Sequence, residues 1–202
     1  MATTTCTQMG RPRAFDAEKA LENALQVFWQ KGYEGASLSD LTSAMGINKP
    51  SLYSAFGNKE QLFLKAIELY EQRPCNSYYP ALEKSTAFEV AEYMLRGAAN
   101  NLADTSHPQG CIVVQGALSC SEAGSSVKQA LIAKRLNTEQ ELCDRFIRAQ
   151  AEGDLPASAD PTALAKFLGT VMQGMAIQAT SGASAEQLMQ VAELSLLAFP
   201  RA

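Results

Sequence analysis

The amino-acid sequence predicts an all-α protein. Apolar residues recur three and four positions apart along most of the chain, which is the spacing of one helical face. Helix-capping residues and glycine breaks divide this pattern into segments of ordinary helix length. One β-branched run, CIVVQ at residues 111–115, is short, and a buried turn of helix explains it as well as a strand does.

The composition is that of a globular protein with a real core, since 47% of the 202 residues are hydrophobic and 19% are charged. No apolar run reaches the roughly 18 residues that a membrane span needs, and the N-terminal residues lack the apolar stretch of a secretion signal. We therefore expect a cytoplasmic protein with no membrane partner. Five cysteines without CxxC spacing and a single histidine argue against a disulfide scaffold and a structural zinc site. We expect neither a metal nor a cofactor.

The first helix follows a polar tail. Residues 1–14 are expected to form a flexible basic arm that ends in GRPR. From Phe15 the pattern is helical, and Gly32 is the type of residue that follows a last helical turn. The apolar stripe of this helix consists of Leu21, Ala24, Leu25 and Phe28.

Two short helices come next. Ser37, with Asp40 three residues later, predicts a capped helix over residues 38–45. Gly46 breaks this helix, and Asn48 can cap a second one. The second helix holds a proline in its first turn, where the missing N–H costs little, and it ends at FGN.

The remaining segments are longer helices. Asn58 caps a helix that continues through Tyr70, and Pro74 is expected to kink or stop it. Beyond Pro80, periodic segments predict helices over residues 88–102, 111–120, 128–152, 162–180 and 186–199.

The two short capped helices, with a glycine-containing turn between them, have the layout of a helix-turn-helix. Such a unit places its second helix in the major groove of DNA. The groove is about 12 Å wide, so a recognition helix of only one or two turns is long enough to lie in it. Leu52 and Phe56 are four residues apart and can hold this helix to the core. The candidates that face elsewhere are Lys49, Pro50, Ser51 and Tyr53, with Lys59 of the next helix within reach of a phosphate.

The net charge of −4 argues weakly against nucleic acid, but the charge is unevenly distributed. From Leu41 to Lys59 there are two lysines and no acidic residue. Attraction at a contact depends on nearby charge, so a basic face on an acidic protein is compatible with phosphate contact. Singly, each candidate is equally explained as a solvated lysine, a surface serine or a half-buried tyrosine. The coincidence of caps, break and acid-free window favours DNA binding.

The segment GRPRAFD, together with ALENALQVFWQKGYEGASLSDLTSAMGINKPSLYSAFGNKEQLF, resembles the DNA-binding head of the TetR family of bacterial transcriptional repressors. The resemblance covers about residues 11–70 and implies a three-helix head joined by a fourth helix to a larger helical body. The signature is Phe28, Gly32, Tyr33, Ser37, Leu38, Leu41, Ala44 and Gly46, followed by SLYSAFGNKEQLF. The DNA-facing positions that it implies are Ser37, Asn48, Lys49, Pro50, Ser51, Tyr53 and Lys59, with Arg11 and Arg13 in a basic arm that reaches phosphate or the minor groove.

The same resemblance implies three regions and a dimer. Residues 15–57 would be the helix-turn-helix domain, and residues 58–202 a helical ligand-binding and dimerisation domain. In the family, the last two helices form a homodimer interface, and both carry more apolar residues here than one core-facing stripe needs. A two-fold dimer suits a palindromic operator on double-stranded DNA, with heads about 34–36 Å apart. The alternative is that these helices serve only the chain's own core.

The resemblance also implies a small-molecule inducer in the body, which displaces the heads from the DNA grooves. Such a ligand must bind the off-DNA state more tightly, because affinity alone shifts no equilibrium. The residues that we expect to line its site are Tyr78, Tyr79, Tyr93, Met94, Cys111, Leu118, Phe146 and Met172.

The cysteines allow a second interpretation. HPQGCIVVQGALSCSEAG, which holds Cys111 and Cys120, resembles a segment of a TetR subgroup in which some members respond to electrophiles or oxidants through a cysteine. Cys111 follows a glycine at an expected helix N-terminus, where the positive end of the helix dipole favours the nucleophilic thiolate. The alternative is that all the cysteines are small buried apolar residues.

Two other classes of protein compete with a regulator. An enzyme is disfavoured because the chain has no HExxH motif, no glycine-rich phosphate loop after a strand, and no nucleophile motif. A helical adaptor protein would not need the recognition helix. An activator would make the same DNA contacts as a repressor. The sequence therefore predicts a TetR-type repressor, released from a palindromic operator by an inducer.

Overall fold

The computed structural model describes residues 15–73, 78–118 and 124–201, except the side chains of residues 117 and 118. Over these ranges the chain is all-helical, which confirms the predicted fold class. The first helices are α1 (Ala17–Gly35), α2 (Leu38–Met45), α3 (Lys49–Phe56) and α4 (Lys59–Glu71). The others are α5 (Tyr78–Leu82), α6 (Ala87–Leu102), α7 (Ile112–Leu118), α8 (Ser125–Ala151), α9 (Pro161–Thr180) and α10 (Ala185–Leu197).

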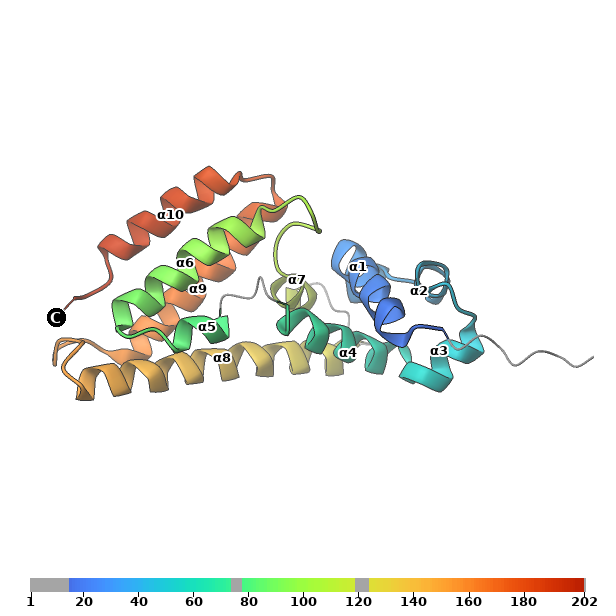
Figure 1. The fold of residues 1–202 in the computed structure, drawn as a ribbon, viewed down its shortest axis with the longest axis horizontal. Coiled ribbons are helices and arrows are strands. Elements are labelled where there is room, and N and C mark those ends of the chain that lie inside the picture. The colour runs from blue at the N-terminus through green and yellow to red at the C-terminus, as the bar shows by residue number, and fades with distance from the viewer. Residues whose placement is uncertain (1–14, 74–77, 119–123, 202) are drawn as a thin grey trace, which may run out of the picture.

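The molecule is elongated, with helices α1 to α3 at one end (Figure 1). We call this end, together with α4, the head, and helices α5 to α10 the body. α8 runs along one side of the body, and α10 lies over α6 on the opposite side. α4 and α7 lie where head and body meet, whereas α3 lies at the outer edge of the head.

The predicted caps set the boundaries of the head helices. The Ser37 hydroxyl accepts the N–H of Asp40 at 3.0 Å, and the Asp40 carboxylate accepts the N–H of Ser37 at 3.0 Å. Gly46 ends α2 in the left-handed conformation, with φ of 68°, which a residue with a side chain adopts only at a cost. Asn48 caps α3 and Asn58 caps α4 through the same type of hydrogen bond, each at 2.9 Å. Side-chain oxygens thus satisfy one of the free N–H groups at the start of each of three successive helices.

The structure differs from the sequence-based expectation at two helices. α1 continues to Gly35 as a kinked extension beyond Gly32, whose φ of 71° interrupts the regular helix where its end was predicted. α5 was not predicted, because it has only five residues with a proline among them and carries no periodic signal. Pro74 lies outside the described residues. None of the described helices has the length and apolar character of a membrane span.

The apolar residues form two cores. The body core is built mainly from α6, α8, α9 and α10. The head core is built from the first four helices, but it continues into Ile112 of α7 and into Val127 and Leu131 of α8. Phe63 of α4 is fully buried in the head core, which therefore extends past residue 57, the expected domain boundary. The head is consequently fixed to the body by shared apolar packing.

Candidate DNA-binding surface and ligand pocket

α3 buries one face and exposes the other. Leu52 and Phe56 are buried, and the ring of Phe56 lies 6.1 Å from the ring of Phe15, as measured between centroids. Lys49 and Pro50 are exposed, and 49% of the surface of Tyr53 is accessible. Ser51 is half-buried. The predicted division of this helix into an anchoring face and a free face is thus present in the structure.

Ser37 and Asn48 lie at the starts of α2 and α3, where their side chains are engaged in capping. The Ser37 hydroxyl also donates to the Asp40 carboxylate at 2.7 Å. Lys31 forms an ion pair with Asp40 at 2.7 Å, and its hydrogen bond, followed by those from Ser37, lowers the pKa of Asp40 to about 2. These two polar residues therefore position helices. A DNA contact from Ser37 would have to share its occupied oxygen, whereas Asn48 could still donate from its side-chain amino group.

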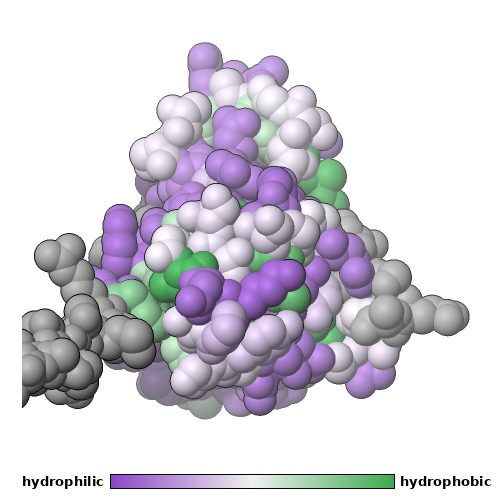
Figure 2. Space-filling model, turned by 90° about the vertical axis from the view of Figure 1, so that its right-hand side faces the viewer, coloured by the Kyte–Doolittle hydropathy of each residue, from purple (hydrophilic) through white to green (hydrophobic). Residues whose placement is uncertain are grey.

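Lys59 lies in the first turn of α4, and its ammonium nitrogen is 4.6 Å from the centroid of the Tyr33 ring. Burial lowers the pKa of this lysine, and attraction to Glu34 opposes that shift. The cation is thus held beside the start of α4, where an anion is favoured. Arg11 and Arg13 lie outside the described residues. Seen from the end that carries α3, the surface is largely hydrophilic or neutral, with small hydrophobic patches (Figure 2).

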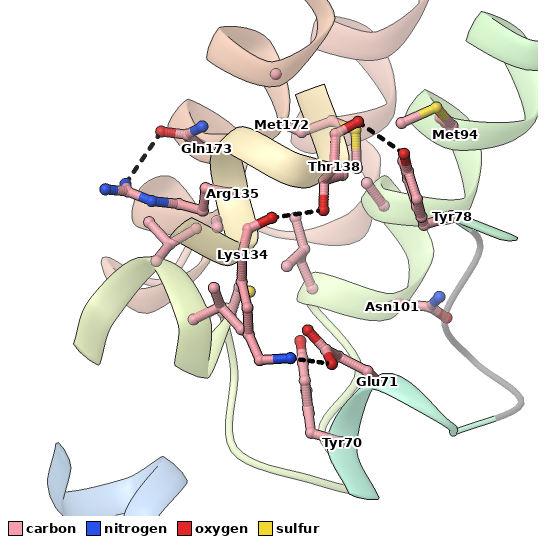
Figure 3. Close-up of a pocket in the computed structure, with 18 of the residues that line it drawn as sticks. Tyr70, Glu71, Tyr78, Met94, Asn101, Lys134, Arg135, Thr138, Met172 and Gln173 are labelled. Carbon is pink, nitrogen blue, oxygen red and sulfur yellow. Dashed lines mark hydrogen bonds and ion pairs between the residues drawn. The ribbon is translucent and has the colours of Figure 1, made fainter. Parts of the chain in front are cut away.

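A cavity of about 230 Å³ lies in the body, next to the head. Five of the residues that we expected around a ligand line it: Tyr78, Tyr79, Met94, Cys111 and Met172. The Tyr78 hydroxyl donates to the backbone carbonyl of Thr138 at 2.7 Å (Figure 3). Burial, together with the neighbouring Glu141 carboxylate, raises the pKa of Tyr78 far above its usual value, so this hydroxyl remains a donor.

Two expected ligand residues do not line the cavity. Phe146 is fully buried in the body core, where its ring packs against Phe199 with centroids 5.5 Å apart. Tyr93 is 41% exposed on the outer face of α6, and the ammonium of Lys84 lies 4.2 Å from its ring centroid. Met94 is the next residue along the helix, and a rotation of about 100° per residue places it on the inner face. The side chain of Leu118 lies outside the described part of the chain.

The cavity also has lining residues that were not predicted, including one from the head. Trp29 of α1 stacks on His107, with centroids 4.6 Å apart and an interplanar angle of 20°, and meets the edge of Tyr70 at 4.8 Å. Lys134 and Arg135 of α8 also line the cavity and were not predicted. No periodicity in the sequence places a residue of the first helix in a cavity of the body, because this contact depends on tertiary packing.

Comparison with known proteins decides the family. The family model for bacterial regulatory proteins of the tetR family matches residues 20–66, and the tetracyclin repressor-like C-terminal domain matches residues 92–193. The HTH-type transcriptional repressor ComR of Escherichia coli strain K12 is 37% identical over 194 residues, which cover 95% of this chain and 92% of ComR. The chain belongs to the TetR family.

Solved structures agree with this assignment. A cysteine mutant of the TetR family regulator CifR, complexed with 26-bp double-strand operator DNA, is 40% identical with a TM-score of 0.89, covering 95% of this chain and 100% of that one. A TetR regulator from Rhodococcus sp. RHA1 is 38% identical with a TM-score of 0.63, covering 93% and 100% of the two chains. This chain is therefore a TetR-type transcriptional repressor with a helix-turn-helix head, and not an enzyme.

The last two helices of this TetR chain carry a second apolar face. On α10, Leu188 and Leu196 are buried against the body. Leu194 and Leu197 of the same helix are 67% and 84% exposed. Val191 of α10 and Ile177 of α9 are also exposed. We call these four exposed residues of α9 and α10 the apolar face.

Cys111 immediately precedes α7 in this TetR body and is half-buried, and its carbonyl accepts the N–H of Gln115 at 3.0 Å. Cys143 is buried, with its sulfur 3.5 Å from the hydroxyl of Thr162. Of these two thiols, only that of Cys111 lies in the cavity wall. Cys120 lies outside the described residues.

Proposed function

We propose that the chain binds a palindromic operator in the cytoplasm as a homodimer, and that a small molecule in the body cavity releases it. The exposed face of α3 is the observation that carries this proposal. Leu52 and Phe56 fix the helix from behind, so that Lys49, Pro50 and Tyr53 stand free at the outer edge of the head. A helix held in this way can enter the major groove without rearranging the core.

The proposed contacts divide by chemistry. Pro50 offers a flat apolar surface to a thymine methyl group, and Lys49 and Tyr53 offer donors to base edges or phosphates. Lys59, beside the start of α4, would bind a phosphate together with the free N–H groups there. Ser37 and Asn48 would act through the helix starts that they cap, and Ser51 from the flank of α3. Arg11 and Arg13 would contact phosphate or the minor groove from the N-terminal arm.

The position of the cavity would let a bound inducer contact the helices of the head. Its lining includes Trp29 of α1 and Tyr70 and Glu71 of α4, so a bound molecule would touch the helices that position α3. A ligand that fits only when these helices have shifted binds the off-DNA state more tightly, which is the condition for release.

Replacing Tyr53 with alanine is expected to weaken operator binding about tenfold, because a hydrogen bond and the contact surface of the ring are lost. Helicity and dimerisation are expected to stay unchanged, since half of this side chain is exposed. Gel shifts with the DNA upstream of the chain's own coding sequence, at several salt concentrations, measure the loss. Tyr93→Ala removes a similarly exposed tyrosine from the body and is expected to leave binding intact. Equal losses in both variants would contradict the assigned role of α3.

Cysteine-based sensing is a second candidate, favoured by the position of Cys111 in the cavity wall. A thiolate there would add to the carbon–carbon double bond of an electrophile such as N-ethylmaleimide: a carbon–sulfur bond forms, the π bond breaks, and the neighbouring carbon takes a proton from water. The adduct would occupy the cavity. We expect Cys111→Ser to bind operator normally but to resist release by this reagent, with Cys143→Ser as the control that still responds. If the Cys111→Ser protein is still released, Cys111 is not the trigger.

A further inference from the structure

The buried polar atoms of the cavity wall are almost all hydrogen-bonded. Among the described residues, three buried side-chain nitrogen or oxygen atoms have no partner: Trp29 Nε1, Arg135 Nε and Arg145 Nη1. Trp29 and Arg135 line the cavity, whereas Arg145 does not. Both unpartnered atoms in the cavity wall are N–H donors. A buried donor without an acceptor is destabilising, so a ligand that brings acceptors gains more here than one that brings donors.

The charges of the cavity wall single out Arg135. The carboxylate of Glu71 pairs with Lys134 at 2.7 Å, and that of Glu139 pairs with Lys166 at 2.5 Å (Figure 3 shows the first pair). Arg135 has no ion pair within the described part of the chain. Its hydrogen bond to the side-chain oxygen of Gln173 is long, at 3.4 Å. One guanidinium in the wall of this cavity is thus left with an uncompensated charge.

The remainder of the wall is mostly apolar. Met94, Leu102, Val114, Leu142, Met172 and Ala176 contribute to it. We propose, on the basis of the function proposed above, that the inducer is a small organic acid. Its apolar body would lie among these side chains, and its carboxylate would be bound by Arg135. Guanidinium and carboxylate match in geometry as well as in charge, and both oxygens can accept from the same arginine. A cavity of about 230 Å³ admits a single aromatic ring or a short acyl chain.

Other charge classes fit less well. A cationic ligand would meet Arg135, and the two carboxylates that could attract it already have lysine partners. A neutral apolar ligand would leave the Arg135 Nε–H and the Trp29 N–H without acceptors and would exclude water from them. A carboxylate at Arg135 removes the first of these costs.

The chain contains its own reporter for this test, because Trp29 is its single tryptophan and lines the cavity. Intrinsic fluorescence of the full-length protein would be titrated with phenylacetate, benzoate and hexanoate, and with the amide of each acid. The amides keep the shape and lose the charge. We expect each acid that fits to change the emission saturably, and to bind at least about tenfold more tightly than its amide.

Arg135→Met keeps an unbranched chain close in length to the aliphatic stem of arginine and removes the guanidinium charge. It is expected to reduce the preference for acid over amide to less than about threefold, while leaving binding of the amide unchanged. Arg148→Met removes the same charge from an exposed position on the same helix, and is expected to keep the preference. Equal affinities of acid and amide for the unmodified protein, an unchanged preference in Arg135→Met, or no binding of any of the three acids up to about 10 mM would overturn the proposal.

A parallel gel shift on the operator separates this inference from the proposed function. If the acids bind but leave the operator complex intact, the carboxylate site stands and the inducer role fails. If neutral molecules release the operator while the acids do not bind, the proposed function stands and this inference fails. Operator binding by the variants without ligand also shows that they are folded.

Discussion

Leu194→Asp is expected to abolish the proposed dimer and, with it, tight operator binding. Leu194 is 67% exposed in the isolated chain and lies on the apolar face of α10. In a two-fold dimer the residue occurs twice, so the lost burial costs about 3–6 kcal/mol for the two copies together. Burying two carboxylates without partners adds to this cost. We therefore expect the dimer dissociation constant to rise at least a thousandfold, or about 4 kcal/mol.

The loss of operator binding follows from geometry. One head alone contacts one half-site, whereas two linked heads bind the second half-site as an intramolecular step. Sedimentation velocity measures the dimer, and a gel shift on the full palindrome measures the operator complex. Leu136→Asp is the matched control, since Leu136 is 56% exposed on α8 and does not belong to the apolar face. A Leu194→Asp protein that stays dimeric, or a Leu136→Asp protein that dissociates, would contradict the assignment of the apolar face.

The head could be predicted almost residue by residue because its signals are local. A cap such as Ser37 with Asp40, or a glycine break such as Gly46, acts within one or two helical turns, and each lies where it was expected. The spacing of Leu52 and Phe56 likewise predicts which face of α3 is buried, because a rotation of 100° per residue fixes it.

The cavity could be predicted only in part. Met94 and Met172 belong to the set expected to line the ligand site, and both line the cavity. Periodicity indicates which residues of a helix face inwards. It does not indicate where the packed helices leave a space, so Phe146, which faces inwards, fills the core instead. Trp29 and Arg135 were missed for the same reason: one comes from the head, and the other from the polar part of a long helix. Their proposed role in ligand binding depends on their own N–H donors lacking acceptors, and only the folded structure shows which donors do.

Phe63→Ala is expected to destabilise the whole chain rather than the head alone. The Phe63 ring is fully buried, and it meets the rings of Phe28 and Tyr33 edge-on, with centroids 5.0 and 5.2 Å away. Removing a buried phenylalanine ring costs about 3–5 kcal/mol, of which each aromatic contact contributes about 0.5–1.5 kcal/mol. For a chain of this length, the melting temperature is expected to fall by roughly 6–20 °C.

The position of Phe63 makes the form of the unfolding transition informative. A Cβ added at Gly116 of α7 would lie 3.7 Å from the tip of the Phe63 ring, so α7 approaches this residue closely. The head core also includes Val127 and Leu131 of α8. Because the head shares this packing with the body, we expect one cooperative transition in the variant, shifted to lower temperature.

Calorimetry and circular dichroism would measure this shift, with Phe63→Leu as the control that leaves a smaller void and loses less. Two separate transitions in Phe63→Ala, with the body melting at its original temperature, would show that the head core does not depend on α7 and α8. In that case a ligand in the cavity could not act on α3 through this packing. A ligand would then have to act on α3 through its direct contacts with Trp29 and Tyr70, which line the cavity.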